Sequence, residues 1–360
     1  MRARELQAFL LTTLMYLTYS FPSNIHSTRC QLKLHSSSSK KNLIVIGNGN
    51  VGKSVLGYIL DGEFPIDSFQ KLYCTYKKHP PSGADCHEGV DYIDFHSIPD
   101  KIISCSHMVI TVPPQILSES SYTDVILDNI EIMKRLPKNI TIGYVSTTGV
   151  YGDHDNAWVD ESSETLCDKK SKAYCYLDIE NRWRMASDKK IFIFRCAGLY
   201  GNDFSALHTV WKQGSHLKRK GENNFALTNE KDSVKENFTS RIHLKDVARS
   251  ICTSITNPYL KGGIYNLADS MPAQRGEVME FAANLFEEMK IEIPSKSNVN
   301  DKKKSERRSR RKKDRKRVSN KKLLSILEND GGLLFPTYIE GFKDIFECNF
   351  NLWKSEKEAQ

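Results

Sequence analysis

Hydrophobic residues recur along this chain in short runs, and the stretches between the runs are long enough to hold a helix. The first run covers residues 43–46 (LIVI), and Val51, Val55 and Ile59 follow it at helical spacing. Further runs of the same kind lie at residues 71–76, 107–112, 140–145, 191–194 and 264–267. Strands that alternate with helices in this way predict an α/β fold with a parallel sheet.

The first predicted strand runs into a glycine-rich turn, residues 47–54 (GNGNVGKS). The turn satisfies the dinucleotide pattern G-x-G-x-x-G and also the phosphate-loop pattern G-x-x-x-x-G-K-[ST]. In the first interpretation Gly47 makes the turn, Gly49 lets the backbone approach a pyrophosphate, and Gly52 lets the helix lie close to the strand. In the second, Lys53 reaches a triphosphate and the next serine holds magnesium.

The strand ends favour the dinucleotide, because a phosphate loop needs an Asp at the end of another buried strand to hold its metal. The run 107–112 leads into two prolines, and the run 140–145 leads into Ser-Thr-Thr. A nucleotide triphosphatase and a plain tight turn remain the alternatives. The predicted dinucleotide site consists of Gly47, Gly49, Asn50, Val51, Gly52, Thr75, Lys77, Lys78, Val112 and Pro113.

The second strand indicates which dinucleotide binds. An NAD site usually places an acid about 20 residues after the glycines, where it binds the ribose 2′-hydroxyl. Here the strand ends at Tyr76 without an acid and continues into Lys77 and Lys78. Two cations suit a 2′-phosphate, so we predict NADP; NAD is the alternative if these lysines only face solvent.

Five motifs in a fixed order resemble the extended short-chain dehydrogenases/reductases, and more narrowly their atypical members related to NAD-dependent epimerases and dehydratases. The motifs occupy residues 47–52, 144–152 (YVSTTGVYG), 195–201 (RCAGLYG), 241–248 (RIHLKDVA) and 265–272 (YNLADSMP). The resemblance covers about residues 42–345. It implies a Rossmann doubly wound parallel sheet with a smaller C-terminal substrate-binding lobe, and oxidoreductase or epimerase-like chemistry on a small polar substrate.

The resemblance also implies catalytic residues, of which this chain has only a part. Thr147 stands where the family has the Ser or Thr that orients a substrate oxygen. The family's Tyr-x-x-x-Lys pair, in which the lysine lowers the phenol pKa, is missing. Tyr174 and Tyr176 are each followed four residues later by a carboxylate, Asp178 and Glu180, which we expect to raise the phenol pKa. Thr147, Tyr174 and Tyr176 are the catalytic candidates. The alternative is a protein without turnover, either an NADP-binding sensor or an RNA-associated plastid factor.

Three other residues are weaker candidates for substrate contact. We expect His243 to fix the loop before a helix that begins near Asp246. We expect Asp160 and Glu161 to lie on a solvated loop with a helix cap.

Length and cysteine content set the class of protein. The chain has 360 residues, enough for one large domain or two ordinary ones. Its nine cysteines are scattered and form no C-x-x-C pair, which argues against a disulfide scaffold and a zinc site. We expect a Rossmann domain at 42–200 and a substrate lobe at 201–295 and 323–350, the latter including a returning Rossmann strand.

The positive charge of the chain is concentrated in two segments that can be separated from the rest. Residues 301–322 carry +11 and residues 1–42 carry +5, while the whole chain carries +8, so the rest of the chain is acidic at −8. We predict a disordered basic insertion at 296–322 that contacts RNA or anionic lipid nonspecifically. A nuclear signal and a solvated loop are the alternatives.

The N-terminal 41 residues have the character of a targeting leader. Arg2 and Arg4 precede an apolar run at 9–19 that is too short to span a bilayer, and residues 20–41 are rich in Ser and basic side chains. The combination resembles the bipartite plastid leader of algae with secondary plastids, which predicts a plastid location. A plain transit peptide and a disordered tail are the alternatives for the leader, and a mitochondrion or the cytoplasm are the alternatives for the location.

We predict that the chain without its leader binds NADPH about tenfold more tightly than NADH, because Lys77 and Lys78 can meet the 2′-phosphate; tenfold corresponds to about 1.4 kcal/mol. Calorimetric titration with each dinucleotide measures the ratio. Replacing both lysines with Ala should abolish the preference, and equal affinity in the unmutated chain contradicts the assignment.

Overall fold

The computed structural model describes residues 41–65, 68–76, 79–83, 86–118, 121–186, 188–213, 237–289, 291 and 314–358. These residues belong to one compact unit, Lys40–Gln360. Residues 1–40 of the predicted leader, residues 296–313 of the predicted basic insertion, and both Lys77 and Lys78 lie outside the described residues.

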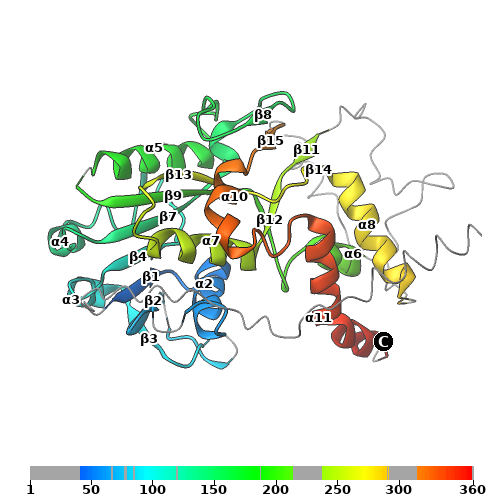
Figure 1. The fold of residues 1–360 in the computed structure, drawn as a ribbon, viewed down its shortest axis with the longest axis horizontal. Helices are drawn as coiled ribbons and strands as arrows, with labels where there is room; N and C mark the ends of the chain where they lie inside the picture. The colour runs from blue at the N-terminus through cyan, green and yellow to red at the C-terminus, as the bar shows by residue number, and fades with distance from the viewer. Residues whose placement is uncertain are drawn as a thin grey trace, which may run out of the picture. The chain divides into compact units, whose positions relative to one another are not determined.

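The centre of the fold is a seven-stranded sheet in the order β13-β9-β7-β4-β1-β2-β3 (Figure 1). Every neighbouring pair in this sheet is parallel. The strands are β1 Asn42–Ile46, β2 Lys71–Tyr76, β3 Val90–Asp94, β4 His107–Ile110, β7 Thr141–Thr147, β9 Lys190–Cys196 and β13 Gly263–Leu267. The strand order reverses direction at β1, which is the doubly wound Rossmann arrangement that the sequence predicts. The predicted α/β fold class is therefore confirmed.

Helices cover both faces of the sheet, so its central strands are buried on both sides. Leu43 and Val45 pack into one core, whereas Ile44 and Ile46, which point the other way, pack into a second. The first core contains side chains of α2 Asn50–Leu60, α7 Leu244–Thr256 and α10 Lys321–Leu327, and the second those of α3 Ile98–Ile102, α4 Ile130–Arg135 and α5 Lys172–Met185. Burial on both sides explains why β1 is a continuous apolar run in the sequence.

The C-terminal lobe has a separate core made largely of aromatic rings. Its helices are α6 Ala206–Gln213, α8 Arg275–Glu288 and α11 Tyr338–Glu358. The rings of Trp211 and Trp353 lie 5.7 and 5.0 Å from the ring of Phe286. No helix within the described ranges is long and apolar enough to cross a membrane.

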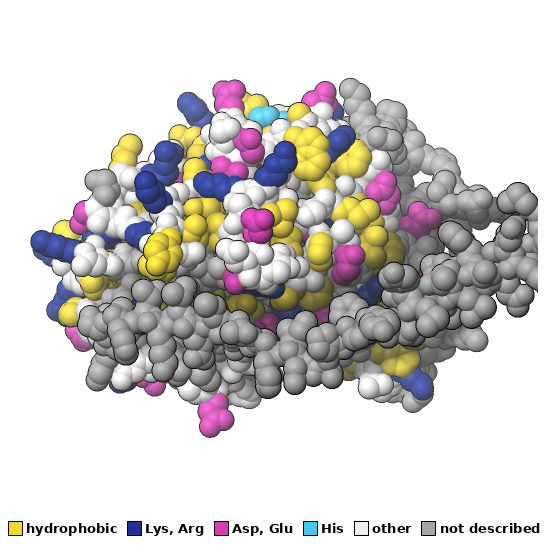
Figure 2. All heavy atoms as spheres, viewed as in Figure 1, with side chains coloured by type: hydrophobic (Ala, Val, Ile, Leu, Met, Phe, Trp, Pro, Cys, Tyr) yellow, Lys and Arg dark blue, Asp and Glu magenta, His cyan; other side chains and the backbone are white. Residues whose placement is uncertain are grey.

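Short strand pairs and single turns of 3-10 helix connect these elements. The pairs are β5 Gln115–Ile116 with β6 Tyr122–Thr123, β8 Trp158–Val159 with β15 Arg317–Val318, β10 Gly198–Tyr200 with β12 Arg241–His243, and β11 Phe238–Thr239 with β14 Ala273–Gln274. The 3-10 turns are η3 Phe95–Ser97, η4 Thr148–Tyr151 and η6 Glu328–Asp330. Basic, acidic and apolar side chains are intermixed on the face seen in Figure 2.

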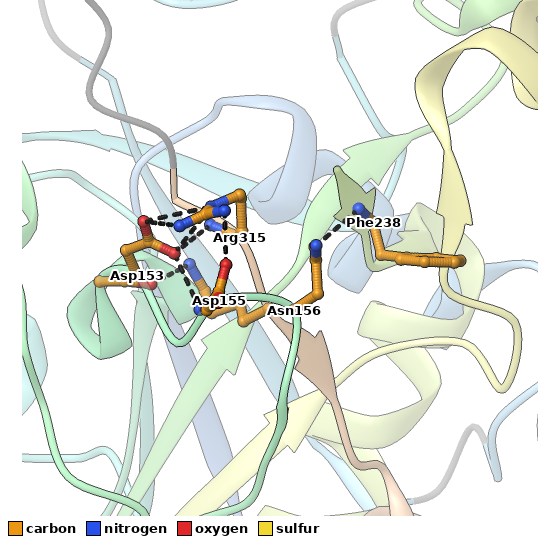
Figure 3. A network of polar contacts seen from close by, with 7 residues as sticks. Asp153, Asp155, Asn156, Phe238 and Arg315 are labelled. Atoms are coloured by element: carbon orange, nitrogen blue, oxygen red, sulfur yellow. Dashed lines mark hydrogen bonds and ion pairs between the residues drawn. The ribbon is translucent and has the colours of Figure 1, made fainter. Parts of the chain in front are cut away.

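Part of the segment that the sequence assigns to a disordered basic insertion is folded. Figure 3 shows the Arg315 guanidinium between two carboxylates, at 3.1 Å from Asp153 and 2.5 Å from Asp155. The backbone carbonyl oxygen of Arg315 accepts hydrogen bonds from the N–H groups of His154 and Asn156. Asp155 and Asn156 adopt left-handed backbone conformations, with φ of 48° and 64°, which residues other than glycine rarely adopt. The contacts with Arg315 hold this turn in place.

The residues after Arg315 are also tied to the body. The Lys316 Nζ donates to the Gly152 carbonyl at 3.1 Å and is buried, and Arg317 begins β15. The Arg317 guanidinium lies 4.3 Å from the centre of the Phe238 ring, and the Phe238 N–H donates to Asn156 Oδ1 at 3.1 Å. The predicted limit at residue 322 is therefore wrong, because a count of charges cannot separate paired cations from solvated ones.

One buried ion pair joins α5 to the sheet. Glu180 is 1% exposed and Arg195 is 3% exposed, and Arg195 Nη2 lies 2.7 Å from Glu180 Oε2. The Ser146 hydroxyl donates to Glu180 Oε1. The guanidinium also lies 4.8 Å from the centre of the Tyr151 ring, and the Tyr151 hydroxyl donates to Asn266 Oδ1 at 2.8 Å. These contacts connect α5 with β7, β9 and β13.

We predict that Glu180→Gln lowers the free energy of unfolding by about 3–5 kcal/mol, because it leaves the Arg195 charge buried without a counter-ion. Urea unfolding measures this loss. The double variant Glu180→Leu with Arg195→Met should lose less than the single one. Asp100→Asn is the matched control, since it breaks an exposed ion pair with Arg135 (2.5 Å) and should change stability little. Equal losses in Glu180→Gln and the control contradict the prediction.

Candidate dinucleotide-binding site

Neighbouring strands hold the glycine turn in shape. Gly47 has a φ of +108°, and its N–H donates to Thr75 Oγ1 at 2.9 Å. From the end of β4, the Thr111 hydroxyl donates to the carbonyls of Ile46 and Gly47 at 3.0 and 3.1 Å. A Cβ on Gly47 would lie 2.7 Å from Val112 Cγ2. Both the backbone conformation and the lack of space require glycine here.

The other two glycines have different physical roles. A Cβ on Gly52 would lie 2.0 Å from the Gly47 carbonyl oxygen, so α2 is packed directly against the turn. A Cβ on Gly49 would have no atom of the described structure within 4 Å. Gly49 is the N-cap of α2, and no side-chain hydrogen bond of the described residues caps this helix. Its first N–H groups are therefore open to an anion, which the helix dipole also favours.

A cavity of about 1220 Å³ lies in front of this turn. It is larger than the roughly 300–1,000 Å³ of most small-molecule sites, as an extended ligand requires. It lies at the carboxyl ends of β1, β2 and β4, where the strand order reverses and where ligands bind in sheets of this kind. Its lining comprises residues 47–49, 53, 75–76, 79–82, 95, 112–115, 123–125 and 128–130.

The structure brings half of the predicted cofactor residues into this lining. They are Gly47, Gly49, Thr75, Val112 and Pro113. Asn50, Val51 and Gly52 form the first turn of α2 and do not line the cavity. Because Lys77 and Lys78 are outside the described residues, the preference for NADP stays a prediction.

Several lining residues could not be found from the sequence. Asp124 and Asp128 come from the segment between β6 and α4, which carries no recognisable motif. Lys53 also lines the cavity, although it entered the sequence analysis only through the phosphate-loop interpretation. The strands beside β1 continue into Tyr76 and Val112 and supply no acid for a metal, so the phosphate-loop interpretation gains no support.

None of the three catalytic candidates belongs to the lining of this cavity. Thr147 ends β7, and its Oγ1 accepts the Gly149 N–H at 3.1 Å. A Cβ on Gly149 would lie 3.3 Å from Thr147 Oγ1 and 3.4 Å from Ala173 Cβ, so the start of α5 packs beside Thr147. Tyr174 and Tyr176 are both half-buried on this part of α5.

The two carboxylates on α5 bind other partners than the sequence suggests. Glu180 is paired with Arg195, and Asp178 interacts electrostatically with the Tyr122 side chain on β6. Burial, followed by the charge of Asp178, raises the pKa of Tyr122 to about 12. The pKa of Tyr176 is raised chiefly by burial rather than by Glu180. The predicted effect of Glu180 on Tyr176 is therefore wrong.

The weaker candidates have structural roles. The His243 side chain caps α7 by accepting the Lys245 N–H at 3.2 Å, and burial lowers the pKa of His243 to about 3. This confirms the expected loop-fixing role. Asp160 accepts hydrogen bonds within its own exposed turn, as expected. Glu161 instead accepts the Asn266 N–H at 2.8 Å and fastens its loop to β13.

Comparison with known proteins shows the fold. No family model matches this chain, and no curated protein sequence matches it. The dTDP-glucose 4,6-dehydratase of Bacillus anthracis, solved in complex with NAD, is similar over 88% of this chain and 99% of its own, with a TM-score of 0.62 and 15% identity.

Two further solved structures have the same fold. The UDP-N-acetylglucosamine 4-epimerase of Bacillus cereus matches with a TM-score of 0.59 and 16% identity, over 85% of this chain and 98% of that one. A conserved protein of unknown function from Silicibacter pomeroyi matches with a TM-score of 0.58 and 20% identity, over 85% and 98%. This chain therefore shares the Rossmann fold of these three solved structures.

We predict that Gly49→Ala weakens dinucleotide binding by about tenfold or more while the melting temperature stays unchanged, because the new methyl group meets only the ligand. Gly52→Ala, the matched variant, should lower the melting temperature as well, since its methyl group would strike the Gly47 carbonyl. Binding titrations and thermal unfolding of both variants test this. Unimpaired binding by Gly49→Ala contradicts the assignment of the site.

Proposed function

We propose that this chain is an NAD(P)-dependent oxidoreductase or epimerase-like enzyme of the extended short-chain dehydrogenase/reductase type, acting on a small polar, sugar-like substrate. One observation carries the proposal: the uncapped start of α2 at Gly49 faces a cavity large enough for a dinucleotide. The B. anthracis dehydratase, whose fold this chain shares, was solved with NAD. We place the pyrophosphate at the N–H groups of α2.

The substrate end of the site belongs near Thr147 on this proposal. A dinucleotide centred on the turn extends along the carboxyl edge of the sheet, and β7 is the neighbour of β4 at that edge. Nicotinamide, when bound, supplies or accepts a hydride. Thr147 would hold the substrate oxygen in position. We assign the acid or base role to Tyr174, which follows Ala173, the residue of α5 that packs near Thr147. Burial raises the pKa of Tyr176 and makes its ionisation harder.

The second candidate function is a dinucleotide-binding sensor without turnover. It is favoured by α5, where the lysine that should follow the tyrosine is replaced and both carboxylates are committed to Tyr122 and Arg195. The proposed contact of the basic segment with RNA or anionic lipid belongs with this alternative and rests on charge alone. The plastid location also rests on the sequence alone.

Turnover separates the two functions. We expect the chain to bind NAD(P)+ and to form NAD(P)H, detected by its absorbance, when a nucleotide sugar or another hydroxylated substrate passes a hydride to the nicotinamide, loses its hydroxyl proton and becomes a carbonyl. Thr147→Val should lower kcat/KM by about 100-fold with little change in dinucleotide affinity, because the substrate oxygen loses its partner. Thr147→Ser keeps the hydroxyl, which also accepts the Gly149 N–H, and should restore turnover.

The tyrosines are tested in the same assay. Tyr174→Phe should abolish most turnover, and Tyr176→Phe is the matched control. Dinucleotide binding without turnover on any such substrate favours the sensor, and failure to bind either dinucleotide contradicts both functions.

A further inference from the structure

One wall of the cavity is a segment that has little regular structure of its own. Residues 122–130 run from β6 to the start of α4 and contribute Thr123, Asp124, Asp128 and Ile130 to the lining. Ile126, in the middle of this wall, is fully buried in the core shared with α5. Ile130 faces outward and is 70% exposed. The shape of this side of the cavity therefore depends on what holds the segment.

Two carboxylates organise the wall from within. Asp128 Oδ2 accepts the Thr123 hydroxyl and the Asp124 N–H, both at 2.8 Å. Asp124 Oδ1 accepts the N–H groups of Ile126 and Leu127 at 2.9 and 2.8 Å. Burial opposes ionisation of Asp128, but hydrogen bonds from Arg182 and Thr123 outweigh it and hold the pKa of Asp128 below its usual value. Asp128 is therefore a carboxylate at neutral pH.

Helix α5 contacts this wall at two positions one helical turn apart. The Asp178 carboxylate faces Tyr122, at one end of the wall, and its charge adds to burial in raising the pKa of that phenol. Arg182 donates a hydrogen bond to Asp128 Oδ1, near the other end of the wall. The hydrogen bonds from Thr123 and Asp124 go to the other carboxylate oxygen, Oδ2. Residues four apart lie on one face of a helix, so both contacts come from the same side of α5. The Arg182 and Asp128 side chains are each 34% exposed, which leaves their charges only partly screened.

We propose that Asp178 and Arg182 are positioning residues for the dinucleotide, acting as a clamp that holds the wall at residues 122–130 against α5. The proposal rests on the function proposed above, because it takes the cavity to be the dinucleotide site. Ile126 anchors the wall in the core without the clamp, so loss of the clamp loosens the wall and leaves the fold intact. A loosened wall releases its ligand faster.

The test uses the full chain carrying Asp178→Ala and Arg182→Gln together. The matched control is Arg184→Gln, which removes a cation from an exposed position on the same helix. Hydrogen exchange of the ligand-free protein reports on the wall through the amides of Asp124, Ile126 and Leu127. Stopped-flow displacement of NADH and NADPH reports on dissociation.

We expect the double variant to exchange these amides, and to release the dinucleotide, about fivefold faster than the unmutated chain, with association rate and melting temperature nearly unchanged. The control should match the unmutated chain in both measurements. The single variant Arg182→Lys leaves Asp178 unchanged and keeps one donor for Asp128. Its rates of amide exchange and dinucleotide release should lie between those of the double variant and the unmutated chain.

Each other outcome overturns the proposal in a distinguishable way. Unchanged exchange shows that α5 does not hold the wall. Faster exchange with unchanged dissociation shows that the wall does not contact the dinucleotide. Faster exchange throughout the chain, with a lower melting temperature, shows a merely structural role. If the unmutated chain binds neither dinucleotide, the proposed function fails, while exchange in the double variant still decides whether the contacts hold the wall.

Discussion

The approach of α2 to the first glycine turn is the constraint on which the site depends. With only 2.0 Å between the Gly47 carbonyl oxygen and the position of a Cβ on Gly52, the helix begins directly behind the strand. Thr75 and Thr111 then bind the turn from the strands on either side. Three parallel strands and one helix N-terminus are thereby fixed around a single point. Neither a longer turn nor a larger residue at Gly52 would leave the N–H groups of α2 facing the cavity.

Burial decides how much of this fold could be predicted from the sequence. The strand runs at 43–46 and 191–194 were found because both faces of β1 and β9 are covered and every position is apolar. The edge strand β3, Val90–Asp94, could not be predicted because its five residues (VDYID) include two acids, form no apolar run and are only partly buried. The paired strands β5 and β6 are two residues long each, too short to give a period.

The site also has a part that could be predicted from the sequence and a part that could not. The glycine turn is recognisable because its three glycines act within six residues of each other. The wall of the cavity is not, because Asp128 and Arg182 meet across 54 positions of sequence and neither belongs to a motif. For Glu180 the sequence suggests a wrong partner. Its spacing from Tyr176 suggests an interaction along the helix, whereas its side chain is buried and binds Arg195. A spacing of four residues gives proximity on a helix, but the stronger partner is set by the neighbouring elements.

The turn at Asp155 and Asn156 joins two segments that lie far apart in the sequence. The Asn156 side chain accepts the Phe238 N–H at the start of β11, and Asp153 and Asp155 bind Arg315 just before β15. The starts of β11 and β15 are therefore coupled through this turn. A substitution that shifts its left-handed backbone would displace both short strands together, although neither is part of the central sheet.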